Sequence, residues 1–128
     1  MKKNSLLLVV NTFPDIKSYL DSYIHSINNQ SFKKFDILIV NQGIDKKKFN
    51  KFKKKPEIIM VNKNKTVAEV RQIGWDHFYN NSYKYIVCSD ADDFFSKNRI
   101  EKSFKKLQRN SFVYNNLIDV DKNGKKIN

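Results

Sequence analysis

Three aspartates within four residues follow a short apolar run, and they are the strongest chemical signal in this sequence. The run is Tyr85–Cys88, and Asp90, Asp92 and Asp93 come directly after Ser89. Side chains two residues apart point to the same side of an extended backbone, so Asp90 and Asp92 can share one ligand. Mg²⁺ and Mn²⁺ prefer carboxylate oxygens and commonly keep substrate phosphates in their other positions. The spacing therefore indicates a divalent metal site with Asp90 and Asp92 as ligands.

The same aspartates have a purely structural explanation. Aspartate is favoured where a strand ends and a helix begins, because its carboxylate accepts backbone N–H bonds at the positive end of the helix dipole. A motif this short also occurs by chance. The rest of the chain has to decide between a metal site and a simple helix start.

The composition is that of one folded domain, residues 1–128, with an αβ core over 1–110 and a strand and hairpin over 111–128. Of the 128 residues 40% are apolar, and ten Phe and six Tyr can fill a core. Because the chain has a single cysteine, Cys88, it cannot form a disulfide with itself. Cys88 lies in an apolar run that we expect to be buried. A reducing cytoplasm is the expected compartment. The apolar start, interrupted at Asn11, is too short for a signal peptide, and no other run is long enough to span a membrane.

The formal net charge of +12 is the second conspicuous feature. Most of the charge lies in two blocks, residues 46–55 and 102–109, which we interpret as solvent-exposed faces of helices. A contact with a polyanion or an anionic membrane surface is the alternative explanation.

Apolar runs alternate with amphipathic segments along the chain. Strands are predicted at 5–10, 35–40, 57–61 and 85–88, and helices at 15–29, 45–54, 66–80 and from a cap at Ser96 to Leu107. Thr66 and Glu69 form a capping box, and the helix after them is predicted to bury Val67, Val70, Gly74 and Phe78. A further strand is predicted to begin at Phe112–Tyr114, followed by a hairpin around Asn123–Gly124.

This alternation predicts an α/β fold: a three-layer α/β/α sandwich around a mainly parallel, Rossmann-like sheet, with a C-terminal β-hairpin. Ligands of such sheets bind beyond the carboxyl ends of the strands. The residues at those ends are Asn11, Thr12 and Phe13, then Asn41 and Gln42, then Asp90–Asp93. The chain has no glycine-rich phosphate loop, so the phosphates of a nucleotide would depend on a metal and a cationic side chain.

At this point the sequence resembles the nucleotide-binding half of a family 2 glycosyltransferase, which has the GT-A fold. Four landmarks lie in the family's order over residues 5–107. The first is a strand followed by Thr12 and Phe13 and then by a helix that closes at Ser26–Phe32. The second is a strand that ends in Asn41, Gln42 and Gly43. The third is the helical segment Val67–Gly74, and the fourth is the acidic segment Ser89–Asp93.

The resemblance implies a nucleotide-diphosphate sugar donor, with a UDP-sugar as the expected one. Asp90 and Asp92 would hold Mn²⁺ or Mg²⁺ across the diphosphate, Phe13 would stack on the base, and Arg71 would approach the phosphates. The implied nucleotide-binding residues are Asn11, Thr12, Phe13, Asn41, Gln42, Arg71 and Asp90.

Two departures from the family pattern matter. The family usually has acidic residues where this chain has Asn41 and Gln42. Because an amide can either accept or donate a hydrogen bond, the identity of the nucleotide base stays open. The family's general base comes from a segment further along the chain. Asp119 and Asp121 are the only carboxylates after Glu101 and are the candidates for this role, although a hairpin turn explains them equally well.

These observations are consistent with three functions. The first is a metal-dependent glycosyltransferase, minimal or truncated, that acts on a glycan, lipid or protein acceptor. The second is a catalytically incomplete nucleotide-sugar-binding module that needs a partner chain. The third is a basic polyanion-binding protein, although nucleic acid is not an expected partner. Exposed apolar surface would favour a homo-oligomer, and the expected location is the cytoplasm or the surface of a membrane.

Overall fold

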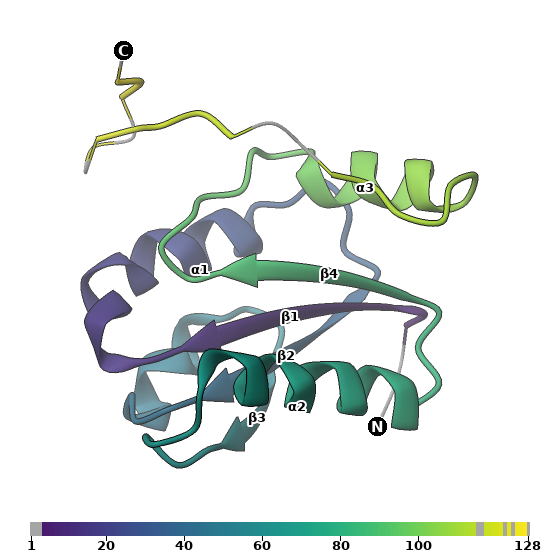
Figure 1. Cartoon of the computed structure of the whole chain (residues 1–128). Coiled ribbons are helices and arrows are strands. Elements are labelled where there is room, and N and C mark those ends of the chain that lie inside the picture. The colour runs from purple at the N-terminus through teal and green to yellow at the C-terminus, as the bar shows by residue number, and fades with distance from the viewer. Residues whose placement is uncertain (1–3, 115–116, 122, 124, 128) are drawn as a thin grey trace.

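The protein is built around a four-stranded parallel sheet. The computed structural model describes residues 4–114, 117–121, 123 and 125–127. The strands are β1 (Leu6–Thr12), β2 (Phe35–Asn41), β3 (Glu57–Met60) and β4 (Tyr85–Asp90), in the order β3-β2-β1-β4 (Figure 1). Because each pair of neighbours is parallel, their carboxyl ends lie at one edge of the sheet.

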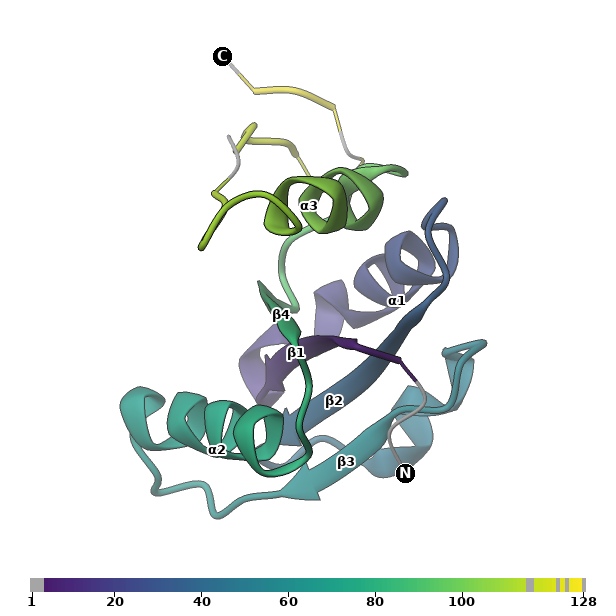
Figure 2. The ribbon, with the colours of Figure 1, turned by 90° about the vertical axis from the view of Figure 1, so that its right-hand side faces the viewer.

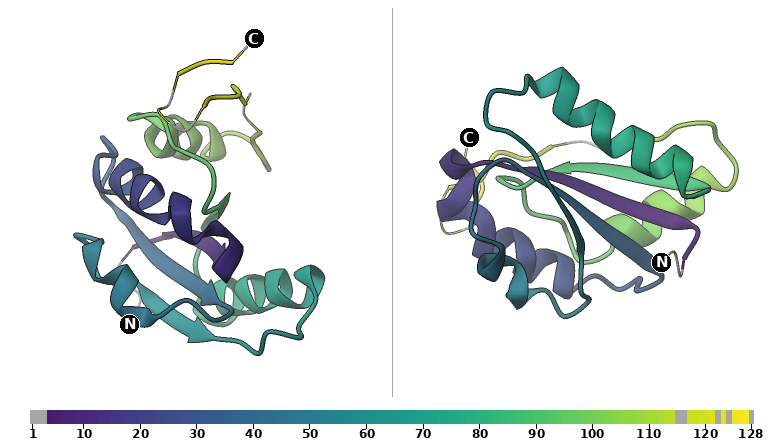
Figure 3. Two further views of the ribbon diagram at one scale, coloured as in Figure 1. Left: turned by 90° about the vertical axis from the view of Figure 1, so that its left-hand side faces the viewer. Right: turned by 90° about the horizontal axis from the view of Figure 1, so that it is seen from below.

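Helices cover both faces of this sheet. The 3₁₀ helix η1 (Pro14–Tyr19), α1 (Leu20–Asn28), the 3₁₀ helix η2 (Lys46–Lys51) and α3 (Arg99–Leu107) lie on one face, and α2 (Val67–Asn80) lies on the other (Figures 2 and 3). Alternate residues of β1 enter the two cores: Leu6 and Leu8 pack on the α1 side, and Leu7 and Val9 on the α2 side. The predicted three-layer α/β/α fold is confirmed.

Helix α2 approaches the sheet closely at Gly74. A Cβ atom at this position would lie 2.8 Å from the Cγ1 atom of Val9 on β1. The predicted capping box is present: the Thr66 hydroxyl accepts from the Glu69 N–H at 3.2 Å, and a Glu69 carboxylate oxygen accepts from the Thr66 N–H at 3.3 Å. These contacts fix where α2 begins and how close it lies to β1.

Several predicted boundaries differ from the structure. The helix predicted over 15–29 begins as the 3₁₀ helix η1, because Pro14 starts the turn and Phe13 provides no side-chain cap. The lysine-rich segment is likewise a six-residue 3₁₀ helix. Val67 was predicted to be buried but is 68% exposed, since it belongs to the first turn of α2 and the side chains that reach the sheet begin at Val70.

Strand β4 lies at the edge of the sheet that the described residues form. Cys88, which we expected inside a buried run, is exposed. On the α1 side of β4, Val87 is buried, whereas Cys88 lines a pocket that α2 leaves open over the other face. The sequence of β4 does not predict how α2 packs over it.

The C-terminal segment forms less regular structure than predicted. Phe112–Tyr114 is not a strand, because no neighbouring strand pairs with it within the described ranges. The hairpin is present as one antiparallel bridge between Val120 and Lys126. Gly124, half of the predicted turn, lies outside the described residues. None of the helices in the described ranges combines the length and apolar character needed to cross a membrane.

Candidate functional site

The carboxyl ends of β1, β2 and β4 bring the candidate residues together. Asn11 on β1 is in register with Asp90 on β4, and Thr12 is in register with Asn41 on β2. Strand β1 continues through Thr12, two residues past its predicted end, so these side chains project from a strand and not from a turn. The chain passes from β1 to β2 on one side and later returns to place β4 on the other, so strand order reverses at β1. Ligands of α/β sheets bind at such a reversal.

The acidic residues after β4 converge. One carboxylate oxygen from each of Asp90, Asp92 and Asp93 lies within 4.8 Å of the others. The turn is closed by a hydrogen bond from the Asp93 N–H to the Asp90 carbonyl at 3.1 Å. Among the described residues, none of the three carboxylates forms an ion pair with a lysine or arginine. Three carboxylate oxygens without an ion-pair partner among the described residues therefore lie close together.

The electrostatics of this cluster suit a cation. Burial raises the pKa of the Asp93 carboxyl above its ordinary value, the charges of Asp92 and Asp90 raise it further, and Arg99 opposes them. Crowded carboxylates repel one another, and a divalent cation relieves that repulsion. Because the donors are hard oxygens, the residues fit Mg²⁺ or Mn²⁺.

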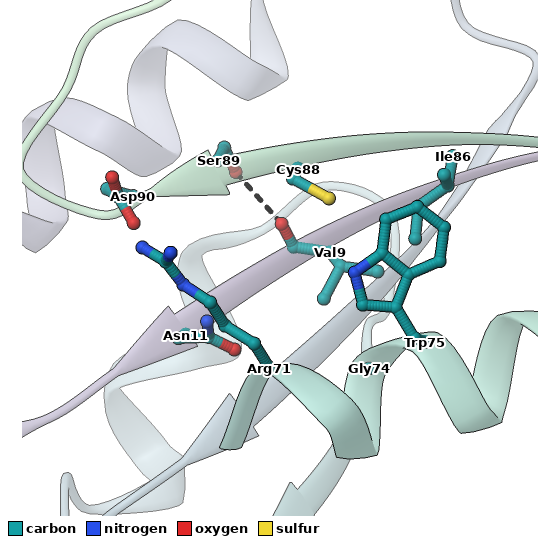
Figure 4. Close-up of a pocket in the computed structure, with 9 residues that line it drawn as sticks. All are labelled: Val9, Asn11, Arg71, Gly74, Trp75, Ile86, Cys88, Ser89 and Asp90. Carbon is teal, nitrogen blue, oxygen red and sulfur yellow. Dashed lines mark hydrogen bonds between the residues drawn. The ribbon is translucent and has the colours of Figure 1, made fainter. Parts of the chain in front are cut away.

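A pocket of about 270 Å³ lies beside the cluster, between α2 and β4 (Figure 4). The guanidinium group of Arg71 points from α2 toward Asp90, with Asn11 beside it, and Trp75 lies next to Ile86 (Figure 4). The lining residues are Val9, Asn11, Arg71, Gly74, Trp75, Ile86, Cys88, Ser89 and Asp90. The predicted residues Asn11, Arg71 and Asp90 thus share one pocket. Its wall combines the positively charged guanidinium of Arg71, the carboxylate of Asp90 and the indole ring of Trp75.

Two lining groups have chemistry of their own. The Oδ1 atom of Asn11 is buried and has no hydrogen-bond donor in the described part of the chain. A buried acceptor without a donor is costly, so a ligand that donates to it would gain binding energy. Although Cys88 is partly exposed, packing around its thiol raises the pKa, against the charge of Arg71. Both features place polar or polarisable atoms at the pocket wall.

Thr12 and Asn41 lie under the site and bond to the protein itself. The Thr12 hydroxyl donates to Asn41 Oδ1 at 2.8 Å, and the Ile44 N–H donates to the same oxygen at 3.1 Å. The Asn41 amide nitrogen donates back to the Ile44 carbonyl at 2.6 Å. Thr12 and Asn41 are buried, so they shape the turn after β2, and their direct contact with a nucleotide stays a prediction.

Gln42 and Phe13 lie at the same edge and are more accessible. The Gln42 amide nitrogen donates to the carbonyl oxygens of Asn62 at 3.3 Å and Lys65 at 3.1 Å. These two carbonyls fix the orientation of the amide, so its oxygen remains as an acceptor. Phe13, which directly follows β1, is 40% exposed. Both side chains are available for the predicted contacts with a base.

The two candidate general bases are not part of this cluster. Asp119 and Asp121 are absent from the group of acidic residues that converge in the described ranges. The Asp121 carboxylate accepts from the N–H groups of Asn123 at 2.8 Å and Lys125 at 2.9 Å. That side chain serves the hairpin turn, and a catalytic role for either aspartate stays a prediction.

Trp75 and Cys88 line the pocket, and sequence reasoning assigned neither of them to the site. Trp75 follows Arg71 by four residues, so the two share one face of α2, and that spacing could have indicated it. Nothing in the sequence indicated Cys88, because its exposure depends on how α2 packs over β4.

Comparisons with known proteins identify the family of the chain. The sequence model described as "Glycosyl transferase family 2" matches residues 8–127. An uncharacterized glycosyltransferase of Rickettsia bellii is 32% identical over 108 residues, covering 80% of this chain and 15% of that protein. An uncharacterized glycosyltransferase of Methanocaldococcus jannaschii is 29% identical over 136 residues, covering 97% of this chain and 45% of that protein.

The fold also matches solved structures. The crystal structure of S. aureus TarS 1–349 in complex with UDP has a TM-score of 0.61, with 16% sequence identity over 80% of this chain and 32% of that one. The chain spans less than half the length of the two relatives above.

Proposed function

The chain belongs to glycosyl transferase family 2, and from this membership we propose that it binds the nucleotide-diphosphate sugar donor of a glycosyl transfer reaction at the carboxyl ends of β1 and β4. The observation that carries the proposal is the convergence of three carboxylates within 4.8 Å, beside a pocket into which Arg71 points (Figure 4). Oxygen ligands next to a guanidinium group suit a metal-bound diphosphate.

Asp90 and Asp92, with Asp93 beside them, would hold Mn²⁺ or Mg²⁺. When bound, the metal would neutralise negative charge on the diphosphate leaving group. Arg71 contributes a fixed positive charge on the α2 side of the pocket, and Asn11 offers its unpaired oxygen to a donor group of the ligand. These side chains bind and orient the donor.

At the β2 end of the site, Phe13 and Gln42 are proposed to contact the base. The exposed ring of Phe13 offers a stacking surface, and the Gln42 oxygen is fixed as an acceptor by the two carbonyls that hold its nitrogen. An acceptor suits the imide N–H of uracil, and the similar TarS fold was solved with UDP. A UDP-sugar is therefore the first donor to test.

The second candidate is a donor-binding module that lacks part of the catalytic machinery. It is favoured by the turn contacts that occupy Asp121, one of the two candidate general bases. Both candidates bind the donor, but only the first transfers or hydrolyses the sugar. A hydrolysis and transfer assay with the bound donor separates them.

Calorimetry with UDP-, GDP- and dTDP-sugars, with and without Mn²⁺, tests the proposal. We expect binding of a UDP-sugar that requires Mn²⁺ and is weakened by Arg71→Ala, while Arg109→Ala, at the far end of the α3 segment, serves as the matched control. Binding of heparin that falls steeply with salt and ignores Asp90→Ala, without any nucleotide binding, would instead support the polyanion function.

A further inference from the structure

Polar side chains on and directly after α1 form hydrogen bonds with residues that flank the acidic turn, residues 90–93, on both sides. Tyr23, Ser26 and Gln30 follow one another at steps of three and four residues, so they lie along one side of this segment. Gln30 is 1% exposed and Tyr23 is fully buried. Buried polar groups of this kind are retained where their hydrogen bonds hold a particular geometry.

Tyr23 holds the chain just before the acidic turn. Its hydroxyl lies 2.6 Å from the Ser89 hydroxyl, which in turn donates to the Val9 carbonyl at 3.2 Å. Since the single proton of Ser89 is used on Val9, Tyr23 is the donor of the shorter bond. Burial raises the pKa of Tyr23, so the phenol keeps its proton. The end of β4 is thereby tied to both α1 and β1.

Ser26 and Gln30 hold the chain just after the acidic turn. The Ser26 hydroxyl accepts from the Phe95 N–H at 3.2 Å. The Gln30 amide nitrogen donates to the Ser96 carbonyl at 2.8 Å and to the Ser26 carbonyl at 3.0 Å. The Gln30 oxygen accepts from the Ile100 N–H at 3.1 Å. Gln30 thus uses both amide hydrogens and its oxygen to tie α1 to the start of α3.

These bonds stop at the flanking residues. They reach Ser89 on one side and Phe95 and Ser96 on the other, and no hydrogen bond from the described part of α1 reaches a carboxylate of the cluster. The ends of the turn are fixed while its ligand oxygens stay unbonded. Hydrogen bonds on both sides of the turn restrict how far the mutually repelling carboxylates can move apart.

We propose that Gln30, with Tyr23 and Ser26, is a positioning residue of the metal site, holding the three carboxylates in the converged arrangement before the cation binds. This inference rests on the proposed function, because it presupposes a cation at Asp90, Asp92 and Asp93. Side chains that orient metal ligands from outside the coordination sphere typically contribute about 10–100-fold to metal affinity.

Mn²⁺ titration followed by electron paramagnetic resonance, with and without UDP, tests the inference. Gln30→Met keeps the length of the side chain and removes its hydrogen bonds, and we expect it to weaken Mn²⁺ binding by about tenfold or more and to change the spectrum of the bound ion. The exposed Gln108→Met is the matched control and should bind Mn²⁺ as the original chain does. Circular dichroism at the titration temperature establishes that each variant is folded.

Tyr23→Phe provides a second variant in case Gln30→Met does not fold, because it removes one hydroxyl and leaves the buried ring. It should also weaken Mn²⁺ binding. If folded variants bind Mn²⁺ within twofold of the original chain and give the same spectrum, the positioning role is wrong while the proposed function stands. If the original chain itself binds no Mn²⁺ with or without UDP, the proposed function fails, and this inference fails with it.

Discussion

At the scale of single residues, the candidate site depends on three aspartates after β4 whose carboxylate oxygens lie within 4.8 Å of one another. The spacing of Asp90 and Asp92 predicted that their carboxylates lie close enough to share a ligand, and the structure brings their oxygens together with that of Asp93. Metal binding by these residues stays a prediction. The hydrogen bond between Thr12 and Asn41 could not be foreseen, because it depends on the register of β1 against β2. The same holds for the unpaired oxygen of Asn11, whose burial depends on the pocket around it.

The single cysteine allows a residue-scale test of where the donor binds. Cys88 lines the pocket and is the only cysteine in the chain. Because burial raises the pKa of its thiol, less of it is thiolate at a given pH than in free cysteine, and alkylation by iodoacetamide should be slow and should accelerate as the pH rises. We expect saturating UDP with Mn²⁺ to slow the alkylation several-fold, as measured by mass spectrometry.

UDP with a chelator in place of Mn²⁺ is the control for that experiment and should leave the rate unchanged. An alkylation rate that is indifferent to UDP and Mn²⁺ together would place the donor outside this pocket.

At the scale of elements, the start of a helix could be predicted from nearby residues, whereas burial and strand pairing depend on residues far away in the sequence. The capping box at Thr66 and Glu69 predicted the start of α2, because both partners lie within one turn of the chain. The exposure of Val67 and the missing strand at Phe112–Tyr114 depend on what lies beside them in space. Neither the helical periodicity of apolar residues nor the length of an apolar run indicates which residues lie beside an element in the folded protein.

Removing the cap should destabilise α2 and with it the wall of the pocket. Thr66→Ala deletes the hydroxyl that accepts from the Glu69 N–H, and such substitutions cost about 1 kcal/mol. Urea denaturation should show a decrease of that size in the free energy of unfolding. Ser111→Ala, outside the helices and strands, is the control and should change little; an equal loss in both variants would contradict the role of the cap.

The other half of the capping box makes the stability of α2 depend on pH. Hydrogen bonds from Thr66 and the neighbouring Lys65 lower the pKa of the Glu69 carboxyl in the folded protein. A lowered folded pKa means that the stabilisation is present above the unfolded pKa and is lost as the pH falls through the folded one. We therefore expect Glu69→Gln to destabilise the protein at neutral pH and to match the original chain in acid.

Urea denaturation of both proteins across that pH range measures the difference directly. If the difference in the free energy of unfolding were the same in acid as at neutral pH, the charge of Glu69 would not be part of the cap.

At the scale of the whole molecule, the order of the strands determines where the site lies. Alternation of apolar and amphipathic segments predicted the α/β class, but the order β3-β2-β1-β4 is a property of the assembled sheet. It puts the reversal of strand order at β1 and leaves β4 at the edge of the described sheet. Aromatic side chains such as Trp75 and Tyr79 on α2 are exposed, so self-association of the chain stays a prediction.

The central claim is that the acidic residues after β4 bind a cation, which in turn holds the diphosphate of the donor. The most direct measurement is UDP binding by Asp92→Ala, with and without Mn²⁺, with Asp15→Ala as the exposed control. The account predicts that Asp92→Ala stays folded and loses the Mn²⁺-dependent part of the affinity, whereas Asp15→Ala keeps it. Normal Mn²⁺-dependent UDP binding by folded Asp92→Ala would contradict the account.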